Sequence, residues 1–303
     1  MRNILFGLMI CLFPLYSAAQ EHAEYNHYVI YPSLINPGAI TKENLHSVFV
    51  NYRTHWSGFD NNQNLITLQY EGPLSEKAGI SARIFNEKIA SLSRFKAQLG
   101  YAYKLKFENY TIGLGLSGEY ETRKLSSDIL QDPNLDPNDP VVASFAGGYS
   151  YFNANFGAHA TSKKGIFVDF ALPKFIIAPF TEGDNGEYPL LQSFIIGGGK
   201  RFNIDENVKF GVIPSIYVRK IYSDNPPTYI DFNLLFSFLE NNLVGGLMYK
   251  VGTNGLGSAL GLTLGASFKG ISLNYSYDAA FYKFQQYNNG SHELTVGVSF
   301  GKQ

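Results

Sequence analysis

Apolar and polar residues alternate along most of this chain, from about residue 47 to its last residues. In segment 229–238, every second residue is apolar: Ile230, Phe232, Leu234, Phe236 and Phe238. Polar residues such as Asp231 and Asn233 lie between them. Side chains of a β-strand point alternately to opposite faces, so this period of two predicts a strand with one apolar and one polar face.

The alternation divides the chain into about fourteen strands, most near the 9–11 residues that cross a bilayer when tilted. They are 47–55, 63–71, 79–86, 93–105, 109–122, 149–160, 164–172, 192–202, 206–219, 228–239, 242–250, 256–268, 271–281 and 292–301. No window approaches the ~20 apolar residues of a membrane-spanning helix. We therefore expect an all-β fold, a transmembrane antiparallel β-barrel of about 14 strands.

The connections between these strands alternate in length. The even-numbered ones are short: 72–78, 106–108, 161–163, 203–205, 240–241 and 269–270. The odd-numbered ones include the long, polar segments 123–148 and 173–191. Barrels of the bacterial outer membrane have short periplasmic turns and longer extracellular loops, so the odd connections are expected outside. Two segments fit less well: the short connection 251–255, and the strand 192–202, which contains Gly197-Gly198-Gly199.

The first residues have the features of an export signal, with Arg2, an apolar stretch and the small residues Ser17-Ala18-Ala19. We expect residues 1–19 to be a signal peptide, 20–45 a pre-barrel periplasmic or lumenal segment, and 46–303 the barrel. The single cysteine, Cys11, lies in the signal, so disulfide and thiolate chemistry are excluded after cleavage.

The amino-acid composition and the last predicted strand also favour a location in the outer membrane. Aromatic residues make up 15% of the chain, with 21 Tyr and 24 Phe, many near predicted strand ends, where the aromatic girdles of membrane barrels lie. The formal net charge of −1 gives no case for a nucleic-acid partner. The last strand, 292–301, alternates and carries Phe300 near its end, which resembles the signal read by the barrel insertion machinery.

Four stretches carry a family resemblance. They are YVIYPSLINPGA (28–39), YRTHWSGFD (52–60), TLQYEGPL (67–74) and GSHEL (290–294). These stretches are similar to the PorP/SprF family of the Bacteroidetes type IX secretion and gliding apparatus, from about residue 25 to the chain end. The chain departs from the family pattern at Gly38-Ala39-Ile40, where the family usually continues Ala-Tyr-Ala-Gly.

The resemblance implies a non-enzymatic outer-membrane barrel beside the type IX translocon. Such a protein helps to export one large secreted surface protein or to hold it at the cell surface. The implied partners are that protein's type IX C-terminal sorting domain, translocon and periplasmic ring components, and outer-membrane lipid. No cofactor is implied.

Three groups of residues are candidates for partner binding. Asn36 and Pro37 lie in the pre-barrel segment, which is either a periplasmic contact, a lumenal plug or an unstructured lead-in. Arg53, Trp56, Gly58 and Phe59 lie where the first strand meets its outer loop, although Trp56 could equally anchor the membrane interface while Arg53 points into the lumen. Asp128, Asp132 and Asp136 lie in loop 123–148, where their spacing differs from a Ca²⁺-binding loop and favours protein docking.

Other motifs do not favour catalysis. Gly113, Gly115 and Gly118 form a G-x-G-x-x-G inside a predicted strand, where glycine eases curvature or makes room for a plug, whereas a dinucleotide site needs the motif to open a helix. The sequence has no H-E-x-x-H, the spacing of a zinc site. The alternatives to a secretion partner are a diffusion porin for small solutes and a soluble periplasmic β-sandwich.

Overall fold

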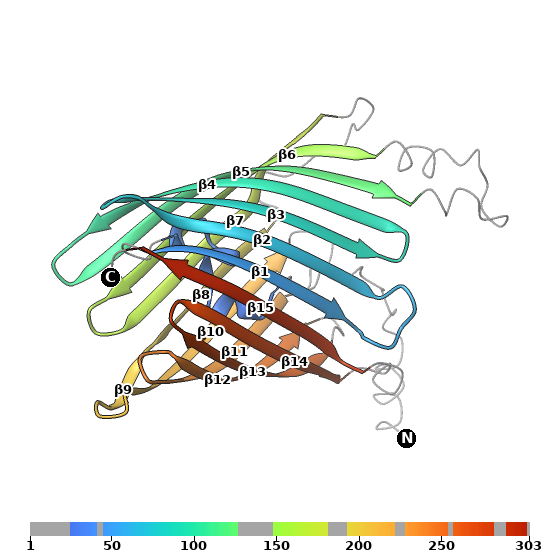
Figure 1. Ribbon diagram of the computed structural model, residues 1–303. Helices are drawn as coiled ribbons and strands as arrows, with labels where there is room; N and C mark the ends of the chain where they lie inside the picture. The colour runs from blue at the N-terminus through green and yellow to red at the C-terminus, as the bar shows by residue number, and fades with distance from the viewer. Residues whose placement is uncertain are drawn as a thin grey trace, which may run out of the picture.

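The computed structural model describes residues 25–40, 45–126, 148–180, 193–221, 228–253, 257–281 and 289–301. Nearly all of them lie in one large antiparallel sheet (Figure 1). Its strands are β1 (His46–His55), β2 (Gln63–Ser75), β3 (Ala78–Ile89), β4 (Leu92–Lys106), β5 (Tyr110–Leu125), β6 (Tyr149–Ser162), β7 (Ile166–Pro179), β8 (Ser193–Lys200), β9 (Phe202–Asp205), β10 (Phe210–Ile221), β11 (Thr228–Phe238), β12 (Leu243–Gly252), β13 (Ser258–Phe268), β14 (Ile271–Phe281) and β15 (Ser291–Phe300).

The sheet closes on itself because its first and last strands pair. β1 pairs with β2 and also with β15, from His46 opposite Phe300 to Thr54 opposite His292. β8 and β9 are separated only by Arg201 and pair with β10 in the same register, with Gly199 opposite Ser215 and Phe202 opposite Val212, until the register shifts between Gly211 and Phe210. They fill one position, so the predicted 14-strand barrel is confirmed.

The burial pattern is the reverse of that in a soluble protein. On β11, Phe232 is 48% exposed and its neighbour Asp231 is fully buried. On β5, Leu116 is 56% exposed and Glu121 is 1% exposed. The apolar faces therefore point outward to lipid and the polar faces point into the lumen, as the alternation predicts.

The short turns lie at the periplasmic end of the barrel. At the turn between β13 and β14, Lys269 and Gly270 have φ values of 49° and 83°, the left-handed geometry of a two-residue hairpin. One extracellular connection is also short: β3 and β4 continue to Ile89 and Leu92, so the predicted connection 87–92 shrinks to two residues. The connection is shorter than predicted because β3 and β4 stay paired as far as Ile89 opposite Leu92.

The glycine triplet belongs to β8 and allows close packing. A Cβ on Gly197 would lie 2.2 Å from the Tyr217 ring, and one on Gly199 would lie 2.3 Å from the Pro214 carbonyl oxygen. The alternation of apolar and polar residues is interrupted at this triplet because the neighbouring strand β10 leaves no room for side chains.

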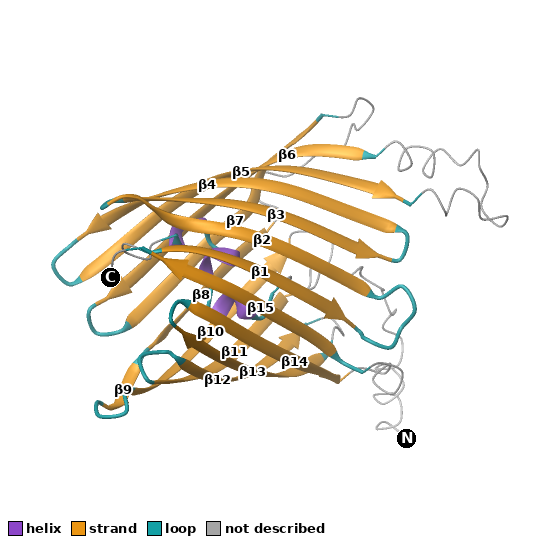
Figure 2. Cartoon of the chain, in the orientation of Figure 1, coloured by secondary structure: helices purple, strands orange, loops and turns teal. Residues whose placement is uncertain are grey.

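The only described helical structure is three short 3-10 turns, η2 (His27–Val29), η3 (Pro32–Leu34) and η4 (Pro37–Ala39). They lie inside the barrel (Figure 2). In the described part of the chain, no helix has the length and apolar character needed to cross a membrane.

Candidate functional site

Residues 25–40 occupy the barrel lumen, and we call them the plug. Proline starts two of the turns, at Pro32 and Pro37, where its fixed φ suits a first helical position and its missing N–H is not needed. The Asn36 side chain caps the third turn by accepting a hydrogen bond from the Gly38 N–H at 2.9 Å. The sequence thus specifies a compact, turned segment.

The wall facing η4 is built from glycines. A Cβ on Gly115 of β5 would lie 2.3 Å from the carbonyl carbon and oxygen of Pro37, and one on Gly157 of β6 would lie 2.0 Å from Asn36 Oδ1. On the plug side, a Cβ on Gly38 would lie 2.7 Å from the Gly113 carbonyl oxygen. Gly115 of the G-x-G-x-x-G pattern, together with Gly157, therefore makes room for the plug backbone.

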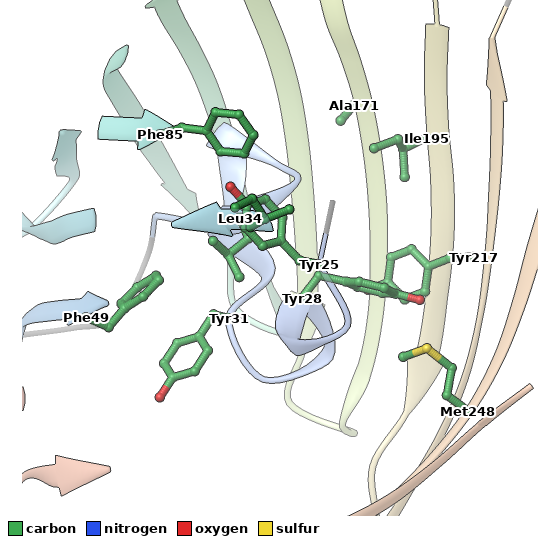
Figure 3. Close-up of a cluster of buried hydrophobic side chains, with 11 residues drawn as sticks. Tyr25, Tyr28, Tyr31, Leu34, Phe49, Phe85, Ala171, Ile195, Tyr217 and Met248 are labelled. Carbon is green, nitrogen blue, oxygen red and sulfur yellow. The ribbon is translucent and has the colours of Figure 1, made fainter. Parts of the chain in front are cut away.

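Three plug tyrosines reach different parts of the wall. The hydroxyl of Tyr25 lies 2.8 Å from Thr67 Oγ1, and that of Tyr31 lies 2.9 Å from Ser272 Oγ. The Tyr28 hydroxyl donates to Asp231 at 2.9 Å. Their rings join a buried cluster of plug and wall side chains (Figure 3). The Tyr28 ring lies edge-on to Tyr217 at 4.9 Å, and Tyr31 stacks on Phe49 at 4.6 Å.

A buried ion cluster lies next to the start of the plug. The Arg53 guanidinium of β1 donates to Glu293 of β15 at 2.5 Å and to Asp278 of β14 at 2.7 Å. Lys250 lies 3.0 Å from the same Asp278. The plug joins this cluster through the Asn26 backbone N–H, which donates to Glu293 at 2.6 Å. Charge-assisted hydrogen bonds thus link four strands, β1, β12, β14 and β15, to the plug.

His27 is the titratable group that the plug places in this cluster. Its Nδ1 lies 2.6 Å from Thr295 Oγ1 and 3.4 Å from Glu293, and its Nε2 lies 2.8 Å from Ser276 Oγ. Burial lowers the pKa of His27 from its ordinary value of 6.5, and the attraction of Glu293 opposes that shift only in part. The imidazole is therefore neutral at pH 7.

A second polar cluster holds the other end of the plug. Asn36 Nδ2 donates to Asp169 at 2.7 Å and to the Ala158 carbonyl oxygen at 2.9 Å. Asp169 also accepts from the Tyr217 hydroxyl and contacts His159 Nδ1, each at 2.8 Å. One buried carboxylate on β7 thus connects the plug to β6 and β10.

A cavity of about 190 Å³, which we call the vestibule, lies between the plug and strands β3–β8, β10 and β11. Ser193, Ile221 and Tyr229 are among its lining residues and lie at the extracellular ends of β8, β10 and β11. The vestibule therefore occupies the extracellular side of the plug.

The structure separates the candidate residues into three places. Asn36, Pro37 and Arg53 are buried in the lumen, in the contacts described above. Trp56, Gly58 and Phe59 lie just after β1, where Trp56 and Gly58 have φ values of 50° and 98° and Phe59 is 41% exposed. Asp128, Asp132 and Asp136 lie outside the described residues. Partner binding by all of these residues stays a prediction.

Sequence reasoning did not single out Asp169, Asp231, Asp278 and Glu293 as a group. Each is at most 4% exposed, and each bonds the plug directly. Their common signal is a carboxylate on the polar face of a predicted membrane strand. Such a group is costly to bury unless a partner in the lumen satisfies it.

The closed sheet, the outward apolar faces and the occupied lumen define a β-barrel protein of the bacterial outer membrane. The family described as "Type IX secretion system membrane protein PorP/SprF" matches residues 17–298. The chain belongs to this family.

Several solved structures are similar to this chain at low sequence identity. The TodX deltaS2S3 mutant, a monoaromatic hydrocarbon channel, has a TM-score of 0.51 at 13% identity, covering 92% of this chain and 95% of that one. The toluene transporter TodX of P. putida has a TM-score of 0.49 at 11% identity, covering 89% of this chain and 94% of that one. Omp33 of Acinetobacter baumannii has a TM-score of 0.46 at 8% identity, covering 86% and 98%. No curated protein sequence matches this chain.

Proposed function

We propose that this protein is a non-enzymatic docking partner of the type IX secretion system. It assists the export or surface attachment of one large secreted protein by holding that protein's C-terminal sorting domain at the extracellular end of the barrel. Membership of the family supports a role in this secretion system. The occupied lumen favours docking of a partner over transport of solutes.

The observation that carries the proposal is the way in which the plug fills the lumen. Its backbone lies against glycines of β5 and β6, and its side chains bond buried carboxylates on β7, β11, β14 and β15. A segment fixed at both ends in this way favours a rigid scaffold over a diffusion pore. The contact surface for partners is then the rim, where Trp56 and Phe59 lie and where the Asp-rich loop 123–148 begins and ends.

Surface display of the secreted protein tests the proposal. We expect a strain that lacks this barrel to retain the secreted protein inside the cell or to shed it into the medium. Replacement of Asp128, Asp132 and Asp136 together by Asn should reduce display while leaving the barrel in the membrane. The matched control replaces Glu76 and Glu108, in periplasmic turns, by Gln. Normal display in the deletion strain would contradict the proposal.

A further inference from the structure

The vestibule has a strong excess of positive charge. Among its lining residues, Arg83, Lys96, Lys174, Arg219 and Lys220 are cationic, and Glu119 is the one acidic residue. Lys174 pairs with Glu121 at 2.9 Å and Arg219 with Asp231 at 2.7 Å. Even with these two carboxylates included, cations outnumber anions by five to three. A walled cavity with this excess concentrates anions, because its low-dielectric walls focus the field.

Arg219 supplies a second, independent observation. One of its terminal nitrogens donates to Asp231, but its buried Nε has no hydrogen-bond partner among the described residues. Buried donors are almost always paired, and a guanidinium matches the geometry of a carboxylate. Because Arg219 lines the vestibule, a carboxylate bound there would meet its guanidinium.

The rest of the lining indicates what accompanies the anionic group. Apolar residues such as Phe156 and Ile195 alternate with polar ones such as Ser81, Gln98 and Ser193. An alkyl chain would desolvate the polar side chains without giving them hydrogen bonds, whereas a peptide backbone can pair with them. A cavity of about 190 Å³ has room for about six water molecules at roughly 30 Å³ each, which is roughly the space of one or two amino-acid residues.

We infer that the vestibule binds the C-terminal carboxylate and last residues of an extended peptide that enters from the extracellular side. The carboxylate lies near Arg219, and the residues before it lie along the mixed wall of β3–β8. This inference rests on the proposed function, in which a C-terminal domain docks at this end of the barrel, and adds that the chain end itself is recognised.

Peptides with and without a terminal charge test the inference. The full-length barrel in detergent micelles is titrated into a fluorescein-labelled hexapeptide of alternating serine and valine, as the free acid or as the carboxamide. Fluorescence anisotropy reports binding. We expect the free acid to bind at least tenfold more tightly than the amide. Equal binding of the two forms, or no binding of either, would overturn the inference.

Two substitutions should act in opposite directions. Arg219→Gln should weaken binding of the free acid at least fivefold, and Glu119→Gln should strengthen it severalfold, because each changes the charge that the carboxylate meets. Lys164→Gln, which removes a charge from the exposed periplasmic turn after β6, is the matched control and should change nothing. Heat-dependent migration on electrophoresis verifies that each variant is a folded barrel. If Arg219→Gln does not fold, an unchanged affinity in Glu119→Gln still overturns the inference.

Octanoate distinguishes a peptide end from a free fatty acid. Competition by octanoate at the concentration where the free-acid peptide binds would overturn the assignment to a peptide. The inference and the proposed function can fail separately. Loss of surface display in the deletion strain together with equal binding of acid and amide peptides would leave the docking function standing without recognition of the chain end.

Discussion

At the scale of single residues, this barrel depends on buried charges that satisfy one another. Arg53 and Glu293 are 2% and 1% exposed, and each makes more than one polar contact. Burying an ion is costly unless its partners replace water, so each member of the cluster stabilises the fold only while the others are present. This dependence makes the cluster sensitive to the loss of any one member.

Replacing Arg53 with Met should destabilise the protein by about 3–5 kcal/mol, because Asp278 and Glu293 would be left buried without their shared cation. Urea unfolding followed by the fluorescence of Trp56, the single tryptophan, measures the change. Lys209→Ala, which breaks the exposed pair with Glu240, is the control and should have little effect. Equal stabilities of the two variants would contradict the role assigned to the cluster.

We predict that acid weakens the binding of the plug to the lumen through protonation of His27. Burial lowers the pKa of His27 below 6.5 while the plug occupies the lumen. His27 therefore binds a proton less readily in this state than when the segment is released. The free energy that holds the plug is therefore fully present above about pH 6.5, falls as the pH drops below that value, and levels off below the lowered pKa. The slope approaches about 1.4 kcal/mol per pH unit.

Hydrogen exchange of residues 25–40 at pH 7.5 and 5.5 measures this effect. Exchange should be faster at the lower pH after correction for the intrinsic rate. His27→Gln should reduce the pH dependence, since glutamine can bond Thr295 and Ser276 without titrating in this range. A pH dependence that is equally large in this variant would assign the effect to the carboxylates around it.

At the scale of elements, the plug and the barrel wall are complementary in shape. η4 lies against β5 and β6, where glycines bring two backbones together. Overpacking such a contact forces the backbone to shift, because neither side has a flexible side chain that can move away. The same glycines would weaken an ordinary strand, so their presence here is explained by the plug.

Gly115→Val should therefore displace η4 from the wall and reduce the free energy that holds it there by about 1–3 kcal/mol, while the barrel still forms. Faster hydrogen exchange at residues 36–40, with unchanged exchange in β12–β15, is the expected result. Gly245→Ala is the matched control, because the nearest atom to its new Cβ is 4.0 Å away. Unchanged exchange at 36–40 in Gly115→Val would show that the wall tolerates a side chain there.

At the scale of the whole molecule, the strands could be predicted from sequence and the contents of the lumen could not. Alternation is a local property, so β5 and β11 follow from their own residues, and errors were confined to ends such as the shortened connection 87–92. The contact of Asn26 with Glu293 spans 267 positions and depends on closure of the whole barrel. The sequence indicated that Gly115 needs space, but only the closed sheet places Pro37 opposite it.

The central claim is that a segment of the chain occupies the lumen of this barrel and prevents free passage of solutes. Single-channel recording in planar lipid bilayers tests it most directly, by comparing the intact protein with a variant that lacks residues 25–40. A barrel of 14 strands has an interior wide enough to conduct ions once emptied. We predict little or no steady conductance for the intact protein and open channels for the variant. Steady conductance of equal size in both would contradict the account and favour a diffusion porin.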